Sequence, residues 1–238
     1  MTVSIEEAMS VSAAAELLGV TEKQVQHLGR QGQLRYLARG LVDASSVRAL
    51  QAARQGKHTR AWSDRTAWAA ISLMSGVPAD WLGQAQISRL RSRVRDSDSH
   101  GLVAATRNRA VMGRFAGHSS AVERLARARR VVVRRALPGI VDSGAVGSVD
   151  CYIDARDERE IVAKYGLRAD GRGTFVLRGV KAQEESDDLG LTMAMVKTVM
   201  AASTVLTALD SAVAEDPRER GVALRLLNDA LAQFRGDG

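Results

Sequence analysis

The stretch from Ala15 to Val47 reads AELLGVTEKQVQHLGRQGQLRYLARGLVDASSV, and glycines interrupt its apolar positions. Apolar residues recur at a helical period as far as Leu18, with Ser12 well placed as the N-cap of that helix. Gly19 predicts its end, since glycine accepts the left-handed conformation that commonly closes a helix. Thr21 is a suitable N-cap for a second helix. The stretch therefore predicts two short helices joined by a turn that contains glycine.

The second helix is expected to bury Val25 and Leu28, which stand three residues apart, and to expose a polar face. Two helices joined in this way form a helix-turn-helix, whose second helix reads the major groove of DNA. Basic side chains donate to phosphates, and glutamine offers the paired donor and acceptor that adenine requires. The residues predicted to contact DNA, in this helix and just after it, are Thr21, Lys23, Gln24, Gln26, His27, Arg30, Arg35 and Arg39.

A small hairpin, or wing, is predicted after the second helix. Residues 33–36 and 41–42 are short strand candidates on either side of Ala38-Arg39-Gly40. Asp43 then suits the N-cap of a third helix, in which Val47, Leu50 and Ala53 follow a helical period. The predicted order of elements is helix, turn, helix, wing, helix.

That order, over about residues 10 to 54, resembles the winged helix-turn-helix of the MerR and excisionase families. The resemblance implies that this part of the chain binds DNA. The chain departs from those families at Gln24 and Gln26, where they often carry basic residues. The alternative is a helical hairpin that binds no DNA.

Composition is that of an ordinary globular protein, with 238 residues, 45% hydrophobic and 26% charged. No apolar run approaches the roughly 18 residues of a membrane span, so no membrane partner is expected. Glu6 and Glu7 stand where a signal peptide needs positive charge, which predicts a cytoplasmic protein. The single cysteine, Cys151, has no partner for a disulfide within the chain.

The net charge of +7 is distributed unevenly. Residues 87–135 contain thirteen arginines, no lysine and three acids, whereas residues 183–238 contain ten acids and five bases. This division favours an anionic partner for the middle and a different surface for the end. The alternative is that the arginine-rich helices are simply solvated.

The rest of the chain predicts an α+β protein. Helices are expected from Ser63 or Asp64 onward and over residues 80–96, followed by a polar break at residues 96–101. Strands alternating with helices then predict a small α/β domain with terminal helices. The expected domains are a winged helix-turn-helix (1–56), a helical arginine-rich connecting segment (57–100) and an α+β domain (101–238).

The second half, over roughly residues 105 to 235, resembles the C-terminal domain of AbiEi-type antitoxins. The elements that carry the resemblance are Tyr165-Gly166-Leu167, Val176-Leu177-Arg178, Leu209-Asp210 and Asp216-Pro217-Arg218. The resemblance implies a repressor of its own operon that is also the antitoxin of a nucleotidyltransferase-like toxin encoded nearby. The MerR-like front of this chain departs from the usual winged helix of that family.

No catalytic constellation is predicted, and neither a metal nor a cofactor is expected. The four histidines are scattered, and Cys151 lies in an apolar strand pattern typical of an inert thiol. Gly171-Arg172-Gly173 fits a hairpin turn, and the acids at 154–160 fit the first turn of a helix. The expected partners are double-stranded DNA at the protein's own operator and the toxin. The alternative is a regulator without a toxin, whose second domain senses a ligand or forms a homodimer.

Overall fold

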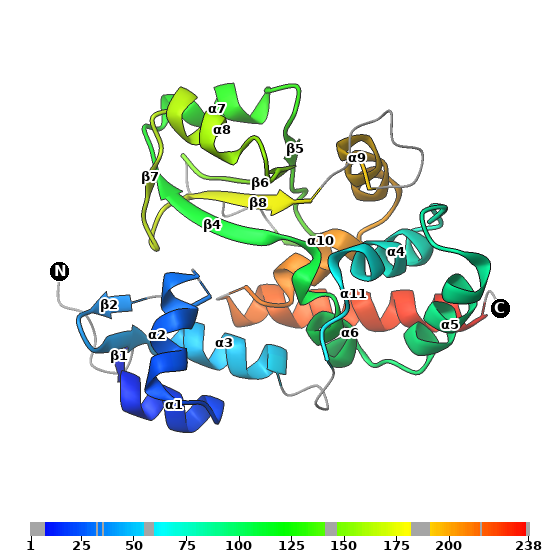
Figure 1. Cartoon of the computed structure of the whole chain (residues 1–238), viewed down its shortest axis with the longest axis horizontal. Helices are drawn as coiled ribbons and strands as arrows, with labels where there is room; N and C mark the ends of the chain where they lie inside the picture. The colour runs from blue at the N-terminus through cyan, green and yellow to red at the C-terminus, as the bar shows by residue number, and fades with distance from the viewer. Residues whose placement is uncertain are drawn as a thin grey trace.

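The computed structural model has both helices and sheets, which confirms the α+β class (Figure 1). It describes the backbone of residues 8–31, 33–34, 36–54, 60–140, 147–181, 191–214 and 216–236. The side chains of residues 45, 49 and 52–54 lie outside that description.

Residues 8–54 form an N-terminal module with its own small apolar core. Its elements are β1 (Ala8–Ser10), α1 (Val11–Leu18), α2 (Glu22–Arg30), β2 (Tyr36–Ala38), β3 (Leu41–Asp43) and α3 (Ala44–Arg54). The three strands form an antiparallel sheet in the order β1-β3-β2. The helices α1 and α2 and the β2–β3 hairpin share this core with α3. Its buried residues include Val25, Leu28, Val42 and Val47.

Local signals set most of the boundaries in this module. Gly19 closes α1 with a φ of 64°, and the Thr21 hydroxyl accepts from the Gln24 amide at 3.2 Å, so both predictions are confirmed. The expected N-cap at Ser12 is wrong. Ser10 takes that role, because it has extended backbone and its hydroxyl accepts from the Ala13 amide at 3.1 Å.

A second sheet has the strand order β5-β6-β8-β4-β7. Its strands are β4 (Val111–Ala116), β5 (Val132–Val133), β6 (Val149–Asp154), β7 (Arg168–Ala169) and β8 (Phe175–Val180). β6 and β8 are parallel, and the other neighbours are antiparallel. α7 (Ser120–Ala126) and α8 (Glu158–Lys164) cover one face of this sheet, where Cys151 and Leu177 pack with Leu125 and Ile161 (Figure 1).

The remaining helices form a second layer that meets the other face of the sheet. They are α4 (Asp64–Met74), α5 (Gln84–Arg95), α6 (Ser99–Ala105), α9 (Met193–Ala202), α10 (Val205–Ser211) and α11 (Pro217–Gly236), with a short 3₁₀ turn at Arg107–Arg109. Trp68 and Val94 lie in one apolar cluster with Leu206 and Leu227, and Tyr152 and Val180 of the sheet join them. The helices of the expected connecting segment, 57–100, therefore share a core with the end of the chain.

Two helices were not expected. α6 occupies part of the predicted polar break, because Asp98 is its N-cap and accepts from the Gly101 amide at 2.6 Å. α9 precedes the predicted helix at the end of the chain. No described helix is by itself long and apolar enough to cross a membrane, and α9 and α10 reach that length only as a pair bent by 91°.

Candidate nucleic-acid interface

α2 presents the predicted polar face to solvent. Val25 is fully buried and Leu28 is 3% exposed. At about 100° of rotation per residue, Lys23, Gln26, His27 and Arg30 fall within an arc of roughly 100° on the opposite side of the helix. All four side chains are exposed. The burial of the apolar pair therefore fixes which side of α2 is offered to a partner.

The other two predicted residues at the start of α2 have different positions. Thr21 is exposed, but its hydroxyl is engaged in capping the helix. Gln24 is exposed on the flank of α2, about 100° around the helix from Lys23. The Gln24 side chain remains available for a contact with DNA, whereas the Thr21 hydroxyl is already used to cap α2.

The hairpin after α2 carries Arg39 at its turn. Arg39 is exposed, and Gly40 beside it has a φ of 81°, a conformation that favours glycine. The Gly40 carbonyl accepts from the Val11 amide at 3.1 Å, which joins the turn to the start of α1. Arg35, also predicted to contact DNA, lies outside the described residues.

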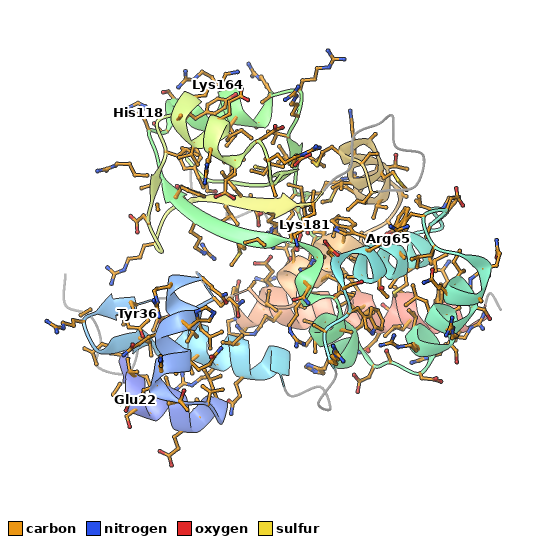
Figure 2. The ribbon with its side chains drawn as sticks, viewed as in Figure 1. Glu22, Tyr36, Arg65, His118, Lys164 and Lys181 are labelled. Carbon is orange, nitrogen blue, oxygen red and sulfur yellow. The ribbon has the colours of Figure 1, made fainter. Side chains whose placement is uncertain are left out.

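β2 packs closely on the end of α2. The ring of Tyr36 lies against Gly29, and a Cβ added at Gly29 would overlap this ring. Burial raises the pKa of Tyr36, and nearby Arg30 partly offsets this effect. In Figure 2, Tyr36 lies on the side of the module nearer the second sheet, and Glu22 lies farther away. A glycine at position 29 thus allows the hairpin to sit directly on the candidate recognition helix.

The arginine-rich helix α5 does not lie near the hairpin. The two are at opposite ends of the longest axis of the molecule (Figure 1). Arg93 stacks on the Trp62 ring at 5.0 Å, and Arg95 lies over the Phe234 ring at 6.0 Å. Arg89 and Arg91 remain exposed. A phosphate contact of α5 beside the wing does not fit this arrangement.

A buried polar network joins the second sheet to the helical layer. Asp210, whose side chain is fully buried, accepts from Arg109 at 2.7 Å, from Arg178 at 3.0 Å and from the Tyr152 hydroxyl at 2.9 Å. The Arg178 guanidinium also donates two hydrogen bonds to the Asp150 carboxylate, at 2.7 and 2.8 Å. We refer to these five residues as the polar network.

Charge pairing governs protonation in the polar network. Burial by itself raises the pKa of Asp210, but Arg178 and Arg109 outweigh it and hold that pKa below its ordinary value. Burial disfavours the charged form of Arg178, yet Asp210 and Asp150 raise its pKa further above the ordinary value. The carboxylate of Asp210 is therefore ionised and fully engaged, which suits a structural connection between layers.

Sequence reasoning missed the polar network. One signal for it exists in β6, where Asp150, Tyr152 and Asp154 alternate with buried apolar residues and so share one face of the strand. The partners gave no such signal, because Arg109 and Asp210 are 101 positions apart.

The residues weighed for catalysis have structural surroundings. Cys151 is buried, and its pKa is raised to about 12, chiefly by burial. Asp154 is bound by Arg156 at 2.7 Å, and the Asp170 carboxylate accepts from the Arg172 amide at 2.9 Å within the turn. This turn is not the expected hairpin, because β7 and β8 each pair with β4 and not with each other. Across the described ranges, no group of three or more His, Cys, Asp and Glu side chains is placed to hold a metal ion.

Comparisons with protein-family models, with curated proteins and with solved structures give no match to this chain.

Proposed function

We propose that this protein is a cytoplasmic DNA-binding transcriptional regulator that represses its own promoter. Its N-terminal module acts as a winged helix-turn-helix, with α2 as the recognition helix and the β2–β3 hairpin as the wing. The observation that carries the proposal is the geometry of α2. This helix is capped by Thr21 and buried through Val25 and Leu28, and it exposes a polar and basic face on its other side.

The exposed side chains divide by chemistry. Lys23, Arg30 and Arg39 provide positive charge for phosphates, which positions the module on the duplex. Gln24 and Gln26 offer the donor and acceptor pair that matches adenine in the major groove. Glutamines in place of basic residues thus favour base readout over charge on α2.

The test is a gel shift with the duplex from directly upstream of the gene. Changing Lys23→Ala and His27→Ala together is expected to weaken binding to this duplex by about 1–3 kcal/mol for each side chain that reads a base. The matched control is His100→Ala with Lys197→Ala, because both side chains are exposed and lie outside the N-terminal module. Equal affinity of the α2 variant and the control variant would remove α2 as the recognition helix.

A second proposal is that the protein is also the antitoxin of a nucleotidyltransferase-like toxin. It rests on the resemblance of the second half to AbiEi-type antitoxins. Two elements of that resemblance meet in the structure, since Arg178 and Asp210 pair at 3.0 Å. A nucleotidyltransferase-like gene next to this one supports the proposal. Its absence favours the alternative regulator, in which the second half senses a ligand or joins two copies of the chain.

A further inference from the structure

The second sheet contacts the proposed wing directly. The Arg172 guanidinium, in the turn between β7 and β8, donates to the Leu37 carbonyl of β2 at 3.0 Å. Leu37 follows Tyr36, whose ring rests on Gly29 of α2. The end of α2, the hairpin and the turn at Arg172 therefore meet at one place.

Two more arginines lie on the neighbouring strands: Arg168 is exposed on the edge strand β7, and Arg114 is half-buried on β4 beside it. Arg168 of β7 pairs in register with Ala116 of β4, and Arg114 stands two residues before Ala116. Since side chains alternate along a strand, Arg114 and Arg168 share one face of the sheet. Phe115 points to the opposite face, where it joins the core beneath α7 and α8. Both arginines thus lie on the face turned away from α7 and α8.

These three residues, Arg114, Arg168 and Arg172, form what we term the arginine edge. Within the described part of the chain, none of the three has an acidic side chain as a partner. By contrast, Arg134, directly after β5, and Arg178 of β8 are both bound by Asp150. The nearest acid in sequence, Asp170, accepts from the Arg172 backbone amide and forms no ion pair with these arginines within the described residues. Residues 168–172 hold a single carboxylate, so the arginine edge, with Arg114, keeps a net positive charge.

We propose that the arginine edge binds backbone phosphates of the same DNA that the wing contacts. This inference rests on the proposed function of the N-terminal module. Three guanidinium groups next to the wing complement a polyanion, and arginine binds phosphate with paired donors. Phosphate contacts position a protein without reading sequence. The second domain thus adds affinity beside the wing, and α2 supplies the specificity.

The test is the salt dependence of binding by the full chain, measured by fluorescence anisotropy. In the charge-removing variant, Arg114, Arg168 and Arg172 are each changed to Gln. The logarithm of the binding constant falls as the logarithm of the salt concentration rises, and each lost phosphate contact makes this fall less steep by about 0.9. The loss of three contacts makes it less steep by about 2.7. The affinity advantage of the wild type then shrinks roughly 40-fold as salt rises from about 50 to about 200 mM. The loss is expected to be equal on operator and on random DNA.

Two matched variants separate charge from structure. Changing Arg91, Arg129 and Arg159 to Gln removes the same charge from exposed positions on α5, after α7 and on α8, and is expected to leave the slope nearly unchanged. Changing Arg114, Arg168 and Arg172 to Lys keeps the charge and is expected to keep most of the slope. If the Gln variant matches the remote control, or if the Lys variant is as weak as the Gln variant, the inference is overturned.

These outcomes also separate the inference from the proposed function. If the wild type binds its upstream duplex and Lys23→Ala with His27→Ala weakens it, the module reads DNA whatever the arginine edge does. A normal slope in the Gln variant then refutes the arginine edge alone. If the wild type binds no DNA, both proposals fail together.

Discussion

At the scale of single residues, Asp210 is a fully buried carboxylate at the centre of the polar network. It is surrounded by Arg109, Arg178 and Tyr152 and has no exposed side-chain surface. A buried ion pair of this kind adds little stability over a well-packed apolar substitute, but removing one partner leaves uncompensated buried charge. Arg109 would be left in that state here, whereas Arg178 would keep its pair with Asp150.

We expect Asp210→Asn to lower the free energy of unfolding by about 3–5 kcal/mol at neutral pH, measured by urea denaturation. Because the pKa of Asp210 is lowered in the folded protein, its contribution is complete above its unfolded pKa of about 4 and is lost as pH falls through the folded value. In Asp210→Asn, the free energy of unfolding should therefore lack the part of its decrease at acid pH that Asp210 causes. The control, Asp229→Asn on an exposed position of α11, is expected to stay within about 0.5 kcal/mol of the wild type. A variant as stable as this control would show that the polar network does not hold the layers together.

At the scale of elements, local chemistry decided what could be predicted. The ends and buried face of α2 depend on Thr21, Val25 and Leu28, which act within a few residues of one another. The choice of Ser10 over Ser12 as N-cap depends on β1, which pairs with β3 more than thirty positions later. The sequence alone offers no signal for a pairing of three residues at that distance.

The contact between α2 and β2 gives a prediction at the same scale. Gly29→Ala improves helix propensity by about 1 kcal/mol, but its Cβ would overlap the Tyr36 ring and force it to move. Overpacking of this kind costs about 1–3 kcal/mol, so we expect a net loss of stability by thermal unfolding. Adding Tyr36→Leu should recover part of it. Gly171→Ala, at a site with open space, is the control. Unchanged stability in Gly29→Ala would contradict the close packing of the wing on α2.

At the scale of the whole molecule, the charge division seen in the sequence is partly neutralised by folding. Arg109 and Arg134 of the basic middle pair with Asp210 and Glu219 of the acidic end. Arg235, near the C-terminus, donates to the Arg95 carbonyl at 2.8 Å. Part of the charge that the sequence pattern assigned to outside partners thus holds the two regions together. Composition could not separate these roles, because it counts charges without regard to what each one faces.

The proposed function requires the full chain to recognise DNA sequence through α2. The most direct test is a fluorescence anisotropy titration with the duplex from its own upstream region and with a scrambled duplex of the same length, at about 150 mM salt. Specific DNA-binding proteins prefer their site by about 10³-fold or more, and we expect a preference of that order. Equal affinity for the two duplexes, or no binding to either, would contradict the proposed function.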